Sequence, residues 1–212
     1  MIKKRTFYHI MNRVRNQLEL YKIKKSGEIQ ETEPVTVAVL DSGIDIKHPD
    51  LEGKLLAFQD FIAKSSVPYD DYGHGTHVCG CIAGGGNASE GIYAGIVPNT
   101  RLIVGKILDK RGDGSVSKMA EAMQWILEIK DTYHIRVLNI SIGTGRGNDE
   151  QEYDEIRKLL NEAWYQGIMI VCAAGNSGPA SGSISMLGMN RNIITVGCHE
   201  GKESYRFGHP CQ

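Results

Sequence analysis

The sequence has no apolar stretch long enough to cross a membrane and no marked excess of either charge. A membrane-spanning helix needs about 20 consecutive, mostly apolar residues, and polar residues interrupt every apolar run of this chain before that length. The formal net charge is -1 over 212 residues, so no overall field draws the protein onto nucleic acid or anionic lipid. We therefore expect neither a membrane nor a nucleic acid among its partners.

The N-terminus also lacks the features of a signal peptide. It begins with basic residues, but Asn12, Arg13 and Arg15 interrupt the apolar stretch that a signal peptide needs next. This pattern predicts a cytoplasmic protein.

Cysteine is scarce, and its number is odd, which argues against a framework of disulfides. At least three of the five cysteines lie inside apolar runs that are typical of core elements. Free, buried thiols in a reducing compartment are the expectation. The five are Cys79, Cys81, Cys172, Cys198 and Cys211.

The composition is that of a globular domain with a short extension. With 41% hydrophobic and 23% charged residues, residues 34–212 can bury one core and are expected to form a single domain. Residues 1–33 form a basic N-terminal extension, in which Ile10, Val14 and Leu18 recur at helical spacing. We expect this extension to contain a short amphipathic helix packed on the domain.

From Pro34 onward, short apolar runs alternate with longer amphipathic ones, which is the pattern of parallel strands joined by crossover helices. The sequence therefore predicts an α/β fold of three layers, with a mostly parallel sheet between helices. The expected strands are Val35–Leu40, Leu102–Leu108, Val137–Ile142, Ile168–Ala174 and Ile193–Val196, and the expected helices are His74–Ala83, Ser117–Lys130 and Glu150–Gln166.

Residues that could take part in catalysis or binding follow several of these strands. In an open parallel sheet, ligands bind beyond the carboxyl ends of the strands. Asp41 directly follows Val-Ala-Val-Leu, Ser141–Gly143 close another strand, and Gly175-Asn176 follow Val-Cys-Ala-Ala. We expect these residues to meet at one edge of the sheet.

Five sequence blocks resemble those of the subtilisin-like serine endopeptidases, also called subtilases or peptidase S8. They stand in the family's order at plausible spacing, and the resemblance covers about residues 35 to 198. The blocks are Asp41-Ser-Gly-Ile-Asp45, His48-Pro-Asp-Leu51, His74-Gly-Thr-His-Val78, Leu138-Asn-Ile-Ser-Ile-Gly143 and Ala173-Ala-Gly-Asn176.

The resemblance implies a role for three side chains. Asp41 would be the buried carboxylate that orients an imidazole, and His74 would be the general base that takes a proton from a serine hydroxyl. Asn176 would donate its amide to the oxyanion that forms on the scissile carbonyl. Taken alone, Asp41 could simply cap a turn, and the Gly-Asn-Ser-Gly sequence around Asn176 is also that of an ordinary turn.

The resemblance also implies a cleft that holds an extended peptide or protein substrate by main-chain pairing. Its two edges would be Gly112, Asp113 and Gly114 on one side and Ser141, Ile142 and Gly143 on the other. Ala174 and Gly175, beside Ala173, would line the pocket next to the scissile bond, where their small size favours a bulky apolar side chain. For Gly112–Gly114 a simple hairpin turn is an equal alternative. In bacterial intracellular relatives a short leader can cross the active site, which is an alternative role for residues 1–33.

The sequence favours no metal site. His77 and His74 share a helical spacing that zinc accepts, with Cys79 or Cys81 nearby, but no second cluster of ligands completes a site. Asp45, His48 and Asp50 are interpreted as a scaffold turn. Some relatives bind calcium in the loop after the histidine helix. Here residues 84–93 do not match such a loop closely, so a calcium requirement remains open.

The family's catalytic serine lies in a Gly-Thr-Ser-x-Ala-x-Pro block, which this sequence does not contain. None of the downstream serines has the apolar strand-to-helix setting of that nucleophile. We therefore expect a domain that is incomplete at its C-terminus, exposes apolar surface and is inactive by itself. The alternative is a catalytically inactive pseudoprotease or peptide-binding module. The sequence does not indicate an oligomeric state.

Overall fold

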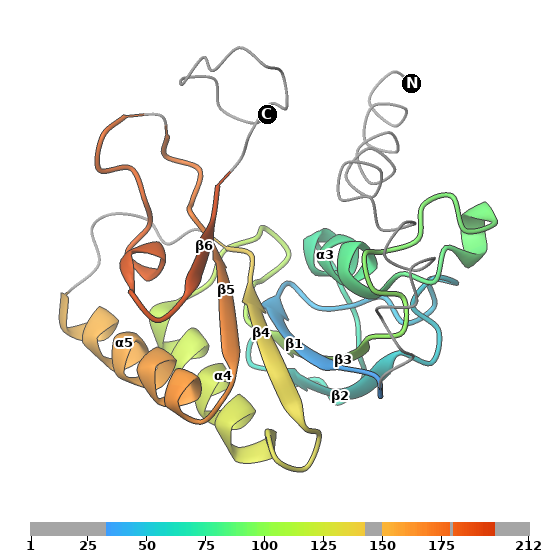
Figure 1. The fold of residues 1–212 in the computed structure, drawn as a ribbon, viewed down its shortest axis with the longest axis horizontal. Coiled ribbons are helices and arrows are strands. Elements are labelled where there is room, and N and C mark those ends of the chain that lie inside the picture. Colours follow the sequence, from blue (N-terminus) through green and yellow to red (C-terminus); the bar gives the residue numbers. More distant parts are fainter. Residues whose placement is uncertain (1–32, 143–149, 179, 198–212) are drawn as a thin grey trace.

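The computed structural model describes residues 33–142, 150–178 and 180–197 (Figure 1). Six strands form one sheet in the order β2-β3-β1-β4-β5-β6, and each neighbouring pair is parallel. The strands are β1 (Thr36–Asp41), β2 (Leu55–Asp60), β3 (Arg101–Lys106), β4 (Ile135–Ile140), β5 (Met169–Ala173) and β6 (Ile194–Val196).

Helices cover both faces of the sheet. Helix α3 (His74–Ala83) packs on one face, and α4 (Val116–Ile129) and α5 (Glu150–Tyr165) pack on the other (Figure 1). Two short 3₁₀ helices, η1 (Asn87–Ser89) and η2 (Leu187–Met189), lie in connecting segments. The predicted three-layer α/β fold is confirmed.

Strand β1 shows why the core divides into two parts. All six of its residues are buried, as expected for a central parallel strand covered on both faces. Because side chains alternate along a strand, Val37 and Val39 pack with the α3 side of the sheet, whereas Ala38 and Leu40 pack with the α4 and α5 side. Asp41, the last residue of this strand, therefore follows a segment that is packed on both faces of the sheet.

The strands and helices predicted within the described residues all occur. The bounds of His74–Ala83 match the prediction, and those of the other elements differ by a residue or two. Strand β2 was not predicted. It lies at the edge of the sheet and its side chains are mostly half-buried. Its apolar residues, Leu55–Phe58, form a short run without alternation, and periodicity alone does not assign such a run to a strand. The predicted helix in residues 1–33 lies outside the described residues, as do Gly143, Cys198 and Cys211. Within the described ranges, no helix has the length and apolar character needed to cross a bilayer.

The strand order places a crevice at the centre of the sheet. β1 lies between β3 and β4, so the chain passes from one side of β1 to the other after β3. The connections that leave β1 and β4 at their carboxyl ends therefore diverge, which is where open α/β sheets bind ligands.

Candidate active site

Asp41 is the last residue of β1, and its side chain is fully buried. Its Oδ1 accepts a hydrogen bond from the Ser42 N–H at 2.7 Å. Oδ2 is buried without a hydrogen-bond partner among the described residues. A buried carboxylate of this kind needs a cationic or polar partner to offset its desolvation.

His74 provides that partner from the first turn of α3. Its Nδ1 lies 2.7 Å from Asp41 Oδ1, and 40% of its side chain is exposed. Because an ionised carboxylate only accepts, we assign the proton to Nδ1, which leaves the Nε2 lone pair free to take a proton. The hydrogen bond that His74 donates to Asp41 raises the pKa of His74 above its ordinary value of 6.5, against the opposing effect of burial.

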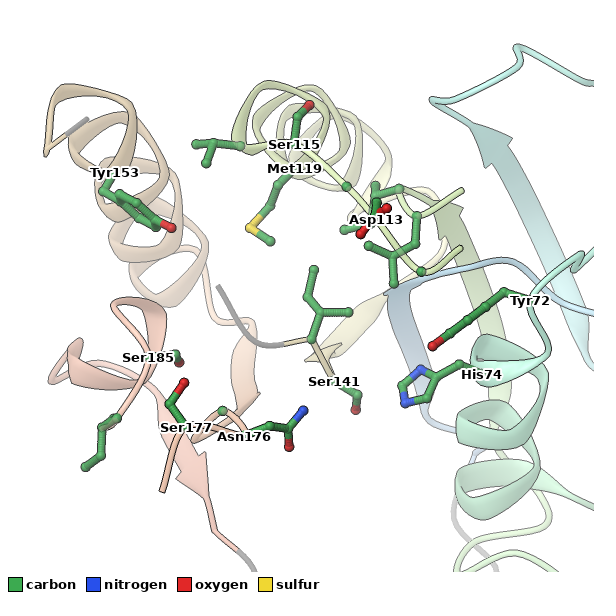
Figure 2. A pocket seen from close by; sticks show the side chains of 18 of the residues that line it. Tyr72, His74, Asp113, Ser115, Met119, Ser141, Tyr153, Asn176, Ser177 and Ser185 are labelled. Atoms are coloured by element: carbon green, nitrogen blue, oxygen red, sulfur yellow. The ribbon is translucent and has the colours of Figure 1, made fainter. Parts of the chain in front are cut away.

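A cavity of about 520 Å³ opens beside this dyad. Figure 2 shows His74 on one wall and Asn176 on the opposite wall, with Ser141 between them. Most of the residues predicted to bind substrate line the cavity, namely Gly112, Asp113, Gly114, Ser141, Ile142 and Gly175, together with His74 and Asn176. The tertiary structure thus collects residues from four connecting segments around one cleft.

Two predicted substrate-binding residues are not seen in the cavity wall. Gly143 lies outside the described residues. Ala174 is not among the residues that line the cavity; its N–H donates to Val196 O and its carbonyl accepts from Ser185 N–H. Its main chain is therefore occupied in holding the edge of the sheet.

Both alternatives for Gly112–Gly114 describe the same segment. Leu108 and Gly114 form an antiparallel bridge, and Asp109 exchanges main-chain hydrogen bonds with Gly112 and Asp113. The segment is thus a tight turn of hairpin type. It also forms one wall of the cavity, so the turn and the predicted binding edge do not exclude each other.

Several residues that line the cavity were not predicted from the sequence. Tyr72 is 50% exposed, and the centroid of its ring lies 6.4 Å from that of His74. Met119 from α4 and Tyr153 from α5 close the far end of the cavity (Figure 2). Met119 is 4% exposed, so it belongs to the core and to the cavity wall at the same time. No local sequence pattern identifies Tyr72, Met119 or Tyr153 as residues that line the cavity.

The serines on the cavity wall have other partners or lie apart from the dyad. Ser185 Oγ donates to Ala173 O at 3.2 Å and accepts from Gly188 N–H. Ser177 and Ser183 line the cavity on the Asn176 side. Among the described residues, the hydrogen bond of the His74 ring is the one to Asp41.

Lys106, at the end of β3, is an unexpected buried cation next to the site. Its side chain is 0% exposed. Its Nζ donates to Ser42 O at 2.6 Å and to Leu108 O at 2.8 Å, and it pairs with Asp71 Oδ1 at 2.6 Å. One ammonium group therefore joins the segments that follow β1 and β3 to the segment that precedes α3.

The described residues contain no group of three or more His, Cys, Asp or Glu side chains arranged to hold a metal ion. In the segment after α3, Asn87 donates to Pro49 O, and Asp50 accepts from Ala88 N–H. Both side chains thus hold the loop itself. These contacts do not test whether the protein requires calcium, a question that the sequence left open.

The described cysteines are free, as predicted. Cys79 and Cys172 are buried and Cys81 is half-buried. Cys81 Sγ lies 3.6 Å from His77 Nε2, one helical turn away on α3. Burial raises the pKa of Cys81 and lowers that of His77, so both groups are neutral at neutral pH.

The parallel sheet with helices on both faces is consistent with a subtilisin-like α/β fold. At its carboxyl edge, the paired side chains of Asp41 and His74 lie beside a cavity that Asn176 also lines. Residues 32–206 match the Subtilase family, Peptidase S8. The chain belongs to the subtilase family.

Proteins to which the chain is similar are named as proteases. It is 39% identical over 180 residues to the serine protease AprX of Bacillus subtilis, an alignment that covers 82% of this chain and 40% of AprX. It is 32% identical over 154 residues to thermitase of Thermoactinomyces vulgaris, covering 73% of this chain and 52% of thermitase. It is 37% identical over 155 residues to subtilisin E of Bacillus subtilis, an alignment that covers 73% of this chain and 37% of subtilisin E. The chain thus spans about half or less of these relatives' lengths.

Proposed function

We propose that the protein is a serine endopeptidase that hydrolyses peptide bonds in extended peptide or protein substrates. The observation that carries this proposal is the 2.7 Å contact between His74 Nδ1 and Asp41 Oδ1 beside an open cleft. The activity stated in the name of the similar serine protease AprX supports it.

In the proposed reaction, His74 Nε2 takes the proton of a serine hydroxyl as the oxygen attacks the scissile carbonyl. We place this serine outside the described residues. Asp41 stabilises the imidazolium that forms, and the Asn176 amide donates to the oxyanion. His74 then gives its proton to the leaving amine. Water repeats the sequence to release the acyl group, with His74 again as base.

Two features of the cleft support an extended substrate. Gly112–Gly114 and Ser141–Ile142 line the cavity from separate segments, and the absence of side chains at the glycines lets another backbone approach. The apolar wall from Val116, Met119 and Ile142 suits an apolar substrate side chain. We therefore propose a preference for apolar residues on the acyl side of the scissile bond.

The test is labelling with a fluorophosphonate probe, together with cleavage of an apolar peptide, by the protein as its gene encodes it. Native protein is compared with His74→Ala. Labelling and cleavage that depend on His74 would support the proposal. Absence of both, with a product peptide still binding in the cleft, would show the peptide-binding alternative. The 212-residue chain, tested in parallel, is expected to remain unlabelled.

A further inference from the structure

The carboxylate of Asp70 lies where the catalytic dyad is assembled and does not touch either member of it. Its Oδ1 accepts from Ser42 Oγ at 2.9 Å, from Gly73 N–H at 2.7 Å and from Tyr72 N–H at 3.2 Å. Its Oδ2 accepts from the N–H and the hydroxyl of Thr76 at 2.8 and 2.6 Å. Five donors fill a carboxylate that offers about four lone-pair sites.

These donors belong to the two segments that carry the dyad. Ser42 directly follows Asp41, whereas Gly73 and Thr76 flank His74 at the start of α3. The cap residue of α3 is Gly73, which has no side chain to satisfy the first N–H groups of the helix. Asp70 does so in its place, and its negative charge suits a helix N-terminus.

Ser42 completes the connection. Its hydroxyl donates to Asp70 and accepts from the Gly75 N–H at 2.9 Å, while its own N–H donates to Asp41 Oδ1. A continuous chain of hydrogen bonds therefore leads from Asp70 through Ser42 to the catalytic carboxylate. A second set of hydrogen bonds, from Gly73 and Thr76, links Asp70 to the first turn of α3, which carries His74.

We propose that Asp70 is the positioning residue of the dyad: it fixes the first turn of α3 against the segment after β1, so that His74 Nδ1 meets Asp41 Oδ1. The role concerns the geometry of the pair and holds whether or not the protein hydrolyses peptide bonds.

Asp70 also acts on His74 through its charge. The hydrogen bonds from Thr76, Gly73 and Ser42 hold the pKa of Asp70 below its ordinary value, although burial alone would raise it. The resulting anion is one of the groups that raise the pKa of His74, after the hydrogen bond and charge of Asp41. The other groups that face His74 are the ring of Tyr72 and, one turn along α3, His77.

Asp60 provides a matched control. Its carboxylate also holds a turn, accepting from the N–H groups of Ile62, Ala63 and Ser65 and from the Tyr69 hydroxyl. It is more deeply buried than Asp70. Its hydrogen bonds do not reach the dyad or Ser42.

The experiment is a histidine ¹H–¹⁵N NMR titration of the 212-residue chain, with the His74 signals identified by their absence in His74→Ala. In Asp70→Asn the pKa of His74 is expected to fall, and its Nδ1 proton is expected to exchange faster with solvent. Asp60→Asn is expected to leave both unchanged. Ser42→Ala keeps the charge of Asp70 and breaks the connection, so it should speed Nδ1 proton exchange with a smaller change in pKa.

Two results would overturn the proposal. One is a folded Asp70→Asn or Ser42→Ala variant whose His74 signals match those of the native chain. The other is an equal effect of Asp60→Asn, which would reduce Asp70 to a general structural role. If Asp70→Asn fails to fold, the test is the comparison of Ser42→Ala with Asp60→Asn. Faster exchange of the His74 Nδ1 proton in Ser42→Ala alone would then support the proposal. Because none of these readouts requires hydrolysis, failure here is distinct from failure of the proposed activity.

Discussion

Gly75, the second residue of α3, packs directly against the backbone of Gly43, two residues after Asp41. A Cβ atom at Gly75 would overlap the Gly43 main chain and lie 3.2 Å from the Asp41 Cβ. Only glycine therefore lets the first turn of α3 approach β1 closely enough for the hydrogen bond between His74 and Asp41.

Gly75→Ala is expected to separate the dyad. The added methyl group meets backbone atoms that cannot rotate away, so α3 must shift relative to the end of β1. The downfield signal of the His74 Nδ1 proton should disappear from the NMR spectrum, and the pKa of His74 should fall.

Gly80→Ala is the control on the same helix. A Cβ atom there meets nothing within 4 Å, and replacing a helical glycine by alanine stabilises by roughly 0.5–1 kcal/mol. This variant should unfold at higher denaturant with its His74 signals unchanged. A Gly75→Ala chain that behaves like Gly80→Ala would contradict the close-packing argument.

The pH dependence of His74 has a defined sign. Its pKa is raised in the folded chain, chiefly by the hydrogen bond to Asp41. The protonated ring thus stabilises the fold fully below its ordinary pKa of 6.5, and this contribution is lost as the pH rises through the folded-state value. Any activity that needs neutral His74 should therefore increase with pH around a midpoint that lies above the ordinary pKa of a histidine. Asp41→Asn should lower the pKa of His74, which an NMR titration can measure.

Lys106→Met should destabilise the chain markedly. It removes the donor to two carbonyls, those of Ser42 and Leu108, and each buried group left unpaired costs about 1–3 kcal/mol. Chemical denaturation measures the loss. Lys64→Met is the control because its ion pair with Glu121 is exposed, and solvent screens such a pair so that it contributes little to stability. Similar losses in the two variants would show that the burial of Lys106 has no energetic consequence.

If the proposed reaction is correct, Asn176→Ala should reduce kcat by about 10²–10³ while leaving KM nearly unchanged, because the amide would donate chiefly to the transition state. The size of this reduction in kcat is the one known for subtilisin and is applied here by similarity. Steady-state hydrolysis of an apolar peptide by the protein as its gene encodes it gives the answer. A rise in KM at constant kcat would instead place Asn176 in ground-state substrate binding.

The three described cysteines should differ in their rates of alkylation. The thiolate is the reactive form, and burial raises the pKa of Cys81, Cys79 and Cys172, in the last case to about 12. Cys81 is the least buried, so iodoacetamide should modify it first, still more slowly than a free thiol. Cys79 and Cys172 should react only on unfolding. Peptide mapping by mass spectrometry distinguishes the three, and early modification of Cys79 would show that α3 opens locally.

The dyad was predictable because its members lie in distinctive local settings. Asp41 ends a continuous apolar run, and such a run becomes a buried central strand whatever its neighbours are. His74 stands between two glycines at the start of an amphipathic segment. Strand β2 was missed because an edge strand with half-buried side chains carries little periodic signal.

The roles of Lys106, Asp70 and Tyr72 were beyond sequence reasoning. Lysine at the end of a strand is normally solvated, and here it is buried only because three connecting segments converge on it. Asp70 and Tyr72 lie in a polar segment with no periodicity, so nothing local indicates their partners.

The sequence by itself determined the parallel α/β architecture and the approximate ends of most strands, because hydrophobic periodicity is a local property. Its short blocks, which resemble those of the subtilases, also predicted Asp41, His74 and Asn176 as site residues. The tertiary structure alone decided which segments meet. The strand order brings β1 beside β3 and β4, and the hydrogen bonds of Asp70 and Lys106 then fix the segments after those strands. Contacts between residues 28 to 64 positions apart depend on how the chain packs, which no local pattern encodes.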